Sequence, residues 1–311
     1  MKKMLFVYNP RAGRELLKQV LSDIIDIFVK ADYEVVIYPT QSYHDAYRKI
    51  VAFEEEYDLI VCSGGDGTID EVVTGMMNRE KRVPIGYIPT GTTNDFANSL
   101  KIPRDLYAAA SNAVSGFPFP CDVGRFNDGI FVYVAAFGLF TDVSYETDQT
   151  MKNLLGHLAY VLEGAKKLFN VPSYRIRVEH DGEIITDEFI FGMVTNSRSV
   201  GGFRSMVGKD VKFDDGVFEV TLIRRPKNPI ELQEIIASLL IEQINTDHMY
   251  TFKAKKISFE SEDEIPWTLD GENGGTHDYV EILNDQKAIQ LVVPEKYVSR
   301  LSIDGEKVLK K

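Results

Sequence analysis

The feature that most constrains the fold is a polar, glycine-rich turn, Ser63-Gly64-Gly65-Asp66-Gly67-Thr68. A short apolar run at 57–62 precedes it, and its length and flanking turn residues indicate a buried strand. The residues at 69–77 follow it, with apolar side chains at helical spacing and acids in the first turn, which indicates a helix. Such a strand–turn–helix unit directs backbone N–H groups and a helix N-terminus at an anion, and its glycines permit close approach of a phosphate.

The turn by itself leaves two interpretations open, because an isolated Gly-Gly-Asp-Gly can be only a sharp turn that caps a helix. Neither GxxxxGK[ST] nor a helix-opening GxGxxG occurs here, which sets the turn apart from two other phosphate-binding loops. Thr68 and Asp66 would place a hydroxyl and a carboxylate where phosphate, or a metal bound to it, could meet them. The complete Gly-Gly-Asp-Gly-Thr between strand and helix is much rarer by chance, and it favours an anion site.

Strands and helices alternate through the first 122 residues. Strands are predicted at 4–8, 35–38, 57–62 and 84–89, and helices at 15–31, 44–56, 69–78 and after Pro103. This alternation predicts an open, mainly parallel α/β sheet covered on both faces. Ligands of such sheets bind beyond the carboxyl ends of the strands. Polar loops at 9–13, Thr40, 64–68 and 90–95 follow the four strands, so we expect them to share one rim.

The pattern changes after Cys121 to shorter strands with few helices. Strands are predicted at 130–137, 174–180, 183–195, 217–223, 254–259, 267–270 and 288–293, and helices at 150–169 and 229–243. Asp-Gly pairs at 181–182 and 215–216 supply hairpin turns. The chain is therefore predicted to form an α/β domain at 1–122 and a mostly antiparallel, β-sandwich-like domain at 123–294. A C-terminal segment from about 295 to 311 is expected to return to the first domain.

Composition narrows the functional class. The net charge of −12 argues against a nucleic-acid-binding protein, which usually carries a basic stripe. Cys62 and Cys121 lie in apolar stretches and are expected to be buried, reduced thiols. The sequence shows no signal peptide, and no apolar run approaches the roughly 20 residues of a membrane-spanning helix. These features predict a cytoplasmic protein.

Five sequence blocks occur in the order seen in one family. They are Asn9-Pro10-x-x-Gly13, Gly64-Gly65-Asp66-Gly67-Thr68, the Pro-Thr-Gly-Thr-Thr-Asn-Asp-Phe-Ala block at 89–97, Phe213-Asp214-Asp215-Gly216 and Leu269-Asp270-Gly271-Glu272. On these blocks the chain resembles the bacterial soluble diacylglycerol kinases and related lipid kinases, which share their catalytic core with eukaryotic diacylglycerol and sphingosine kinases. The resemblance spans nearly the whole chain. Gly-Gly-Asp-Gly-Thr alone also occurs in phosphofructokinases and NAD kinases, so the other blocks carry the specificity.

The resemblance implies a kinase that uses ATP and magnesium and phosphorylates diacylglycerol or a similar lipid at the inner face of the membrane. The first domain would hold the nucleotide, the β-rich domain would help to bind the lipid, and two copies would pair through the second domain. Carried over position by position, the ATP site would comprise Asn9, Pro10, Arg11, Ala12, Gly13, Thr40, Gly64, Gly65, Asp66, Gly67, Thr68, Ile69, Asp70 and Thr92.

The resemblance also implies the catalytic acids. Glu272 is favoured as the proton acceptor, with Asp270 positioning it or contacting magnesium, although the sequence does not decide which of the two is the base. Asp66 and Asp95 would act through magnesium, since hard cations prefer carboxylate and water oxygens. For Asp95 the alternative is an N-cap of the following helix. For the Leu-Asp-Gly-Glu block the alternative is a plain hairpin turn.

A second, structural magnesium site is implied at Asp215, with the backbone carbonyls of Lys212 and Val217 as companions. The alternative for Asp215 is an ordinary turn acid, because Asp-Gly is a common turn pair.

Three positions depart from the family pattern. Asp70 stands where the family usually has Asn, Asn98 where many members have Arg, and Glu163 where a related kinase has a basic residue. Each departure removes positive charge or adds negative charge, which leaves the lipid substrate open. The departures at Asp70 and Asn98 keep open a nucleotide-binding regulator that has lost catalysis. Among enzymes, the alternative is a kinase of NAD or another small molecule.

Overall fold

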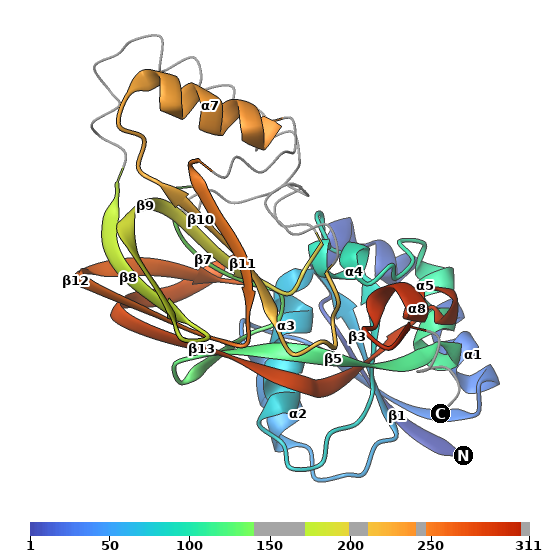
Figure 1. Ribbon diagram of the computed structural model, residues 1–311. Coiled ribbons are helices and arrows are strands. Elements are labelled where there is room, and N and C mark those ends of the chain that lie inside the picture. Colours follow the sequence, from blue (N-terminus) through green and yellow to red (C-terminus); the bar gives the residue numbers. More distant parts are fainter. Residues whose placement is uncertain (140–171, 199–210, 241–246, 306–311) are drawn as a thin grey trace. The chain divides into compact units, whose positions relative to one another are not determined.

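The computed structural model describes residues 1–139, 172–198, 211–240 and 247–305 (Figure 1). The chain divides into two compact units, the first formed by 1–123, 212–215 and 285–311 and the second by 124–211 and 216–284. The domain bounds expected from the sequence, 1–122 with about 295–311 and 123–294, stay a prediction. The expected helix at 150–169, with Glu163, lies outside the described residues.

The first unit is an α/β domain built on parallel strands (Figure 1). Its strands are β1 (Lys2–Tyr8), β2 (Tyr33–Pro39), β3 (Leu59–Gly64) and β4 (Ile85–Pro89), adjacent in the order β4-β3-β1-β2. Its helices are η1 (Ala12–Glu15), α1 (Leu16–Lys30), α2 (Asp45–Ala52), α3 (Asp66–Met77), α4 (Asp95–Ser99) and α5 (Leu106–Ser115). The predicted mainly parallel α/β architecture is confirmed.

Hydrophobic patterning explains the core of this unit. All six residues of β3 are buried, as expected for a central strand covered on both faces. Leu17, Ile24 and Phe28 of α1 pack into one cluster with Phe6 of β1, and the small alanines of α5 join it. Gly86 lets β4 approach α5 closely, because a Cβ there would lie 2.7 Å from the Cβ of Ala113. Helices α1 and α5 therefore pack closely against the sheet whose carboxyl edge carries the polar loops.

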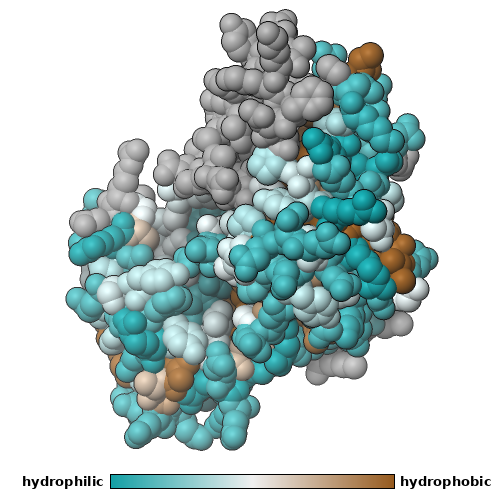
Figure 2. Space-filling model, turned by 90° about the vertical axis from the view of Figure 1, so that its left-hand side faces the viewer, coloured by the Kyte–Doolittle hydropathy of each residue, from teal (hydrophilic) through white to brown (hydrophobic). Residues whose placement is uncertain are grey.

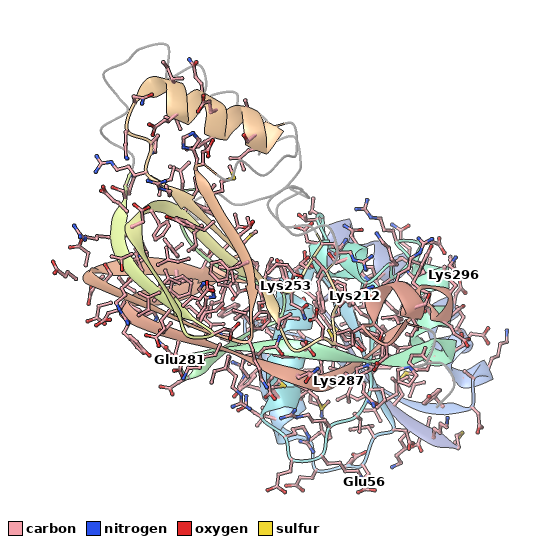
Figure 3. All side chains as sticks on the ribbon, in the orientation of Figure 1. Glu56, Lys212, Lys253, Glu281, Lys287 and Lys296 are labelled. Carbon is pink, nitrogen blue, oxygen red and sulfur yellow. The ribbon has the colours of Figure 1, made fainter. Side chains whose placement is uncertain are left out.

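A buried carboxylate fastens the C-terminal part of the chain to this unit. Asp214 accepts a hydrogen bond from the Ser302 hydroxyl at 2.6 Å and another from the Ile303 amide at 2.7 Å. The ammonium of Lys287 lies 3.9 Å from the same carboxylate (Figure 3). Strand β13 (Glu272–Val293) enters the unit at 285 and pairs with β4, and η3 (Glu295–Tyr297) and α8 (Val298–Leu301) follow it. Asp214 and its partners Lys287, Ser302 and Ile303, called here the Asp214 clasp, therefore join three segments that are remote in sequence.

The second unit is mostly antiparallel β-structure, as predicted. Its strands are β6 (Gly129–Phe131), β7 (Val134–Gly138), β8 (Tyr174–His180), β9 (Glu183–Thr195), β10 (Phe218–Arg224), β11 (Met249–Ala254), β12 (Lys256–Leu269) and the first part of β13, with one helix, α7 (Pro229–Leu240), among its described residues. They pair in the order β11-β10-β9-β7-β12-β13, and β8 pairs with both β9 and β12. Trp267 is buried in the core between Phe126, Phe137 and Phe259.

Several expected element bounds are wrong in informative ways. Helix α3 begins at Asp66 rather than at Ile69, so half of the glycine-rich turn belongs to the first helical turn. The strand expected at 254–259 is divided between β11 and β12, and the one expected at 288–293 is the end of the 22-residue β13. Strand β5 (Phe117–Phe126) was not expected at all.

The surface, the two cysteines and the helices can each be compared with the expectations from composition. On the face shown in Figure 2, most of the described residues are hydrophilic, with hydrophobic ones scattered among them. Both cysteines are buried with free thiols, as predicted. Within the part of the chain that the structure describes, no helix has the length and apolar character needed to cross a membrane.

Candidate active site

The glycine-rich turn joins β3 to α3 with almost no room for side chains. A Cβ on Gly64 would lie 2.3 Å from the Thr68 hydroxyl, and one on Gly91 would lie 2.6 Å from the Cα of Gly65. Gly65 occupies the N-cap position of α3 and provides no side-chain cap. The first amides of a helix have no intrahelical acceptor, so an uncapped N-terminus beside glycines is suited to bind an anion.

The loop after β4 packs directly against this turn. The amide of Thr90 donates to the carbonyl of Gly64 at 2.8 Å. Gly13, in the loop after β1, has a φ of +57°, and a Cβ there would lie 2.0 Å from the Thr90 carbonyl oxygen. The loops that follow β1, β3 and β4 therefore meet, and glycine is needed where they touch.

Hydrogen bonds between backbone groups place the loops after β1 and β2 at the same edge of the sheet. The amide of Asn9 donates to the Ser63 carbonyl at 2.8 Å, and the amide of Thr40 donates to the Tyr8 carbonyl at 2.9 Å. The Asn9 side chain accepts from the Arg11 amide at 2.9 Å, which closes the first loop. The carboxyl ends of β1, β2 and β3 thus form one rim, as the alternating pattern predicted.

The other residues of the expected ATP site occupy different environments around this rim. Pro10 and Ala12 are half-buried in the first loop, and Thr92 is exposed in the segment that leads to α4. Gly67 and Asp70 lie in the first turns of α3, where both are half-buried. The Ile69 side chain is 1% exposed, so any contact it makes with a ligand would use its main chain.

Asp66 links the glycine-rich turn to α4. Its carboxylate accepts hydrogen bonds from the amides of Asp95 at 3.2 Å and Phe96 at 3.4 Å. Burial raises the pKa of the Asp66 carboxyl, and these hydrogen bonds oppose the rise. Asp95 is the first residue of α4, and Asn94 holds the N-cap position with a φ of 52°. The N-cap alternative for Asp95 is therefore wrong, and the first residues of α3 and α4 adjoin.

In the second unit, the Leu-Asp-Gly-Glu block forms the tight turn between β12 and β13. Asp270 and Gly271 have φ values of 52° and 86°, and Leu269 pairs with Glu272 across the turn. Two consecutive residues with positive φ are typical of a type I′ hairpin, which Asp-Gly favours. The plain-turn interpretation is thus correct for the backbone, while Glu272 is left half-buried at the start of β13.

The side chain of Asp270 does more than favour a turn. Its carboxylate is buried and accepts hydrogen bonds from the amides of Val132, Tyr133 and Val134, the corner between β6 and β7. The Asp270 amide donates to the Val134 carbonyl at 2.8 Å, and the Tyr133 hydroxyl donates to the Asp270 carbonyl at 3.2 Å. Three N–H donors on one carboxylate hold the hairpin, and with it Glu272, in a fixed position.

Comparison with known proteins gives the same result along the whole chain. Residues 3–126 match the family model of the diacylglycerol kinase catalytic domain, and residues 134–292 match that of the YegS C-terminal NAD kinase beta sandwich-like domain. The chain is 34% identical over 303 residues to a diacylglycerol kinase of Bacillus subtilis (strain 168), which covers 97% of this chain and 99% of the relative. The chain belongs to the diacylglycerol kinase family.

Further relatives and a solved structure agree. A diacylglycerol kinase of Staphylococcus carnosus (strain TM300) is 33% identical over 296 residues, with 94% of this chain and 96% of the relative covered. A solved diacylglycerol kinase of Bacillus anthracis str. Sterne is 25% identical with a TM-score of 0.72, covering 94% of this chain and 97% of that one. As a member of the diacylglycerol kinase family, the chain is a phosphotransferase, which confirms the resemblance drawn from the five sequence blocks.

The structural magnesium site expected from this family stays a prediction. Lys212 and Asp215 belong to the first unit and Val217 to the second. The Lys212 ammonium donates to the Arg300 carbonyl at 3.2 Å, so its charge is engaged near α8 (Figure 3). Among the described residues, no three or more His, Cys, Asp or Glu side chains gather as a metal site. The expected set relies instead on one carboxylate and two carbonyls, a chemistry that suits a hard cation.

Two residues that hold the loops around this rim were missed by sequence reasoning. Asn94 exchanges two hydrogen bonds with the backbone of Gly91, at 2.9 and 2.7 Å. Glu71 accepts from the amides of His44 at 2.9 Å and Ala46 at 3.0 Å. Asn is common in turns because its side chain bonds nearby backbone groups, and that preference is the local signal at Asn94. The bonds of Glu71 join positions more than twenty residues apart, so no local pattern could have indicated them.

Proposed function

We propose that the protein is an ATP- and magnesium-dependent lipid kinase that transfers the γ-phosphate of ATP to the hydroxyl of diacylglycerol or a similar lipid. The observation that supports this most directly is the uncapped N-terminus of α3 beside Gly64 and Gly65, in a chain of this family. Phosphoryl transfer depends on positioning and charge neutralisation more than on covalent catalysis. The backbone amides at the N-terminus of α3 would contribute to both. The ATP phosphates would bind at residues 64–68.

Acidic side chains at the rim suit a metal that accompanies the nucleotide. Asp66 and Asp95 adjoin at the starts of α3 and α4, and they would hold magnesium directly or through water. Bound magnesium would neutralise charge on the phosphate oxygens as the γ-phosphoryl group moves. The hydrogen bonds that Asp66 accepts from α4 would keep its carboxylate oriented for that contact.

Glu272 is proposed as the proton acceptor and Asp270 as the residue that positions it. The Asp270 carboxylate already holds three backbone amides, so a positioning role fits it better than proton transfer. Glu272 would take the proton of the lipid hydroxyl while the hydroxyl oxygen forms a bond to the γ-phosphorus. The bond between that phosphorus and the β,γ-bridging oxygen breaks, which releases ADP and the phosphorylated lipid.

One observation favours a second candidate. The family model matched at 134–292 is described as NAD kinase beta sandwich-like, so a kinase of NAD or another small molecule remains the alternative. A nucleotide-binding regulator without turnover is the other alternative. We also propose that the reaction takes place at the cytoplasmic surface of the membrane. Two copies of the chain would pair through the second domain.

A panel of acceptors separates these functions. Purified protein would be incubated with labelled ATP, magnesium and, in separate reactions, diacylglycerol, monoacylglycerol, sphingosine and NAD. Transfer to diacylglycerol or another lipid supports the proposal, and transfer to NAD alone supports the alternative. ATP binding without transfer to any acceptor would indicate the regulator.

Replacing Glu272→Gln tests the assigned base. Loss of a general base slows such reactions by about 10²–10⁴-fold, whereas the affinity for ATP should stay close to that of the wild type. Turnover and ATP affinity would be measured for both proteins. Glu281→Gln is the matched control in the same strand, because Glu281 is paired with Lys256 on β12 (Figure 3). An unchanged rate for Glu272→Gln would exclude Glu272 as the base.

A further inference from the structure

Two aromatic rings stand exposed on the loop that follows β2. The rings of Tyr43 and His44 are adjacent, with centroids 3.9 Å apart and planes tilted by 52°. Tyr43 is 62% exposed, although a large ring normally gains from burial. The pair comes directly after Thr40, whose amide is bonded to the end of β1 at the rim. It therefore lies on the loop that leaves the edge strand of the sheet at the rim.

The loop that carries the rings is held in one conformation. The Asp45 carboxylate accepts from the Gln41 amide at 2.7 Å and from the Tyr38 hydroxyl at 3.2 Å. The Arg48 guanidinium donates to the Ser42 hydroxyl at 2.8 Å and to Asp45 at 3.3 Å. Five residues thus brace the segment on both sides of the rings, so the rings need little ordering before they bind a ligand.

Glu71 ties the ring pair to the helix of the phosphate site. Its two carboxylate oxygens accept from the amides of His44 and Ala46, and α2 and α3 lie side by side (Figure 1). His44 has a φ of 58°, a left-handed conformation that is uncommon for a residue other than glycine. Such backbone strain persists where the surroundings enforce it, and here Glu71 provides part of that constraint.

We propose that Tyr43 and His44 form a platform on which the purine base of the nucleotide stacks. The inference rests on the proposed function, because it requires a nucleotide whose phosphates bind at the N-terminus of α3. Aromatic faces stack on bases without regard to hydrogen-bond pattern, and Tyr43 is exposed beside the ring of His44. Glu71 would then act as a positioning residue that fixes the platform relative to the phosphate loop.

The test compares ATP with inorganic tripolyphosphate, which has the same phosphate chain and no base. Dissociation constants for both would be measured by calorimetry on the full chain, with Tyr43→Ala, His44→Gly and Tyr43→Phe. Tyr43→Ala and His44→Gly should weaken ATP binding about tenfold, the effect of losing one stacking contact, and leave tripolyphosphate binding unchanged. Tyr43→Phe keeps the ring and should bind ATP like the wild type. Glycine at 44 accommodates the positive φ, so His44→Gly should fold.

Two further variants sharpen the comparison. Tyr107→Ala removes another exposed tyrosine, on α5, and should alter neither affinity. Glu71→Ala should raise the ratio of the ATP to the tripolyphosphate dissociation constant, whereas Glu71→Gln, which retains one acceptor, should restore most of it. A role in general stability alone would change both dissociation constants together and leave the ratio constant.

The outcomes distinguish the platform from the proposed function. If the wild type binds ATP and Tyr43→Ala and His44→Gly leave its dissociation constant unchanged, the platform is refuted and the kinase proposal stands. Equal weakening of ATP and tripolyphosphate also refutes the platform. If the wild type binds neither ligand, the proposed function itself fails.

Discussion

Asp66 combines two opposing influences in one side chain. Burial raises the pKa of its carboxyl above the ordinary value of 3.8, while hydrogen bonds from α4 amides lower it. Since the net shift is upward, the folded chain holds this proton more tightly than the unfolded chain. The contribution of Asp66 to the free energy of unfolding is therefore greatest below the unfolded pKa and falls as the pH rises through the folded pKa.

Replacing Asp66→Asn should remove this pH dependence. The free energy of unfolding would be measured by urea denaturation between about pH 3 and 7, without nucleotide or divalent cations, for wild type and variant. The advantage of the wild type over Asp66→Asn should be largest at the lowest pH and should shrink as the pH rises. An advantage that grows with pH would show that the amide hydrogen bonds outweigh burial.

At the residue scale, the sequence indicates where glycine and acid are needed but not all of their partners. Gly64, Gly65 and Asp66 are visible as a strand–helix turn because the pattern is local. The partners of Asp66 on α4 lie about thirty residues away, and those of Glu71 lie on α2. Such contacts depend on tertiary packing, and no local pattern in a single sequence indicates them.

Two hairpin turns with the same Asp-Gly sequence make very different contacts in the structure. The Asp181-Gly182 and Asp270-Gly271 turns both have positive φ at two consecutive residues. Asp181 is exposed, whereas Asp270 is buried and holds three backbone amides of the β6–β7 corner. The same dipeptide is therefore a simple turn in one place and a structural anchor in the other.

Matched replacements measure that difference. Asp270→Ala leaves buried amides without acceptors, at about 1–3 kcal/mol each, so the free energy of unfolding should fall by roughly 3 kcal/mol or more. Asp181→Ala alters only an exposed turn and should cost about 1 kcal/mol or less. Chemical denaturation of both variants provides the measurement. Similar losses would mean that the Asp270 carboxylate does not anchor the corner.

At the element scale, turn chemistry decided how well strands could be predicted. The bounds of β8 and β9 were predicted correctly because Asp181-Gly182 marks the hairpin between them. Strand β5 was missed because Pro118 and Pro120 argue against a strand, although proline is tolerated at strand edges. The length of β13 was missed because its first eight residues are mostly polar or glycine and none of them is buried.

For the whole molecule, the alternating pattern predicted the α/β and β-rich architecture, since hydrophobic periodicity reports on layers. It did not indicate that 212–215 belong with the first unit. That assignment depends on the buried carboxylate of Asp214 and its bonds to Ser302 and Ile303. In the sequence, Asp214 is indistinguishable from its neighbour Asp215, the acid assigned a role by resemblance.

Truncation tests the discontinuous first unit. Ending the chain after Asn284 removes Leu291, which pairs with Ile85 on β4, and both hydrogen-bond donors to Asp214. We expect this variant to lose ATP binding and to become sensitive to proteolysis within residues 1–123, although 3–126 match a family domain by themselves. Ending the chain after Gly305 is the control. Wild-type ATP affinity after truncation at 284 would contradict the prediction.

The division of the chain also bears on how the protein is made. Residues 1–123 emerge from the ribosome before the β13 segment and before Ser302, which bonds to Asp214, because both of these lie beyond residue 284. The second unit ends at 284, so all of it is available sooner. Folding during translation usually proceeds from the N-terminus. Here the first unit can be completed only after residues from 285 onward have emerged, so its N-terminal segment is made well before its last β-strand partner.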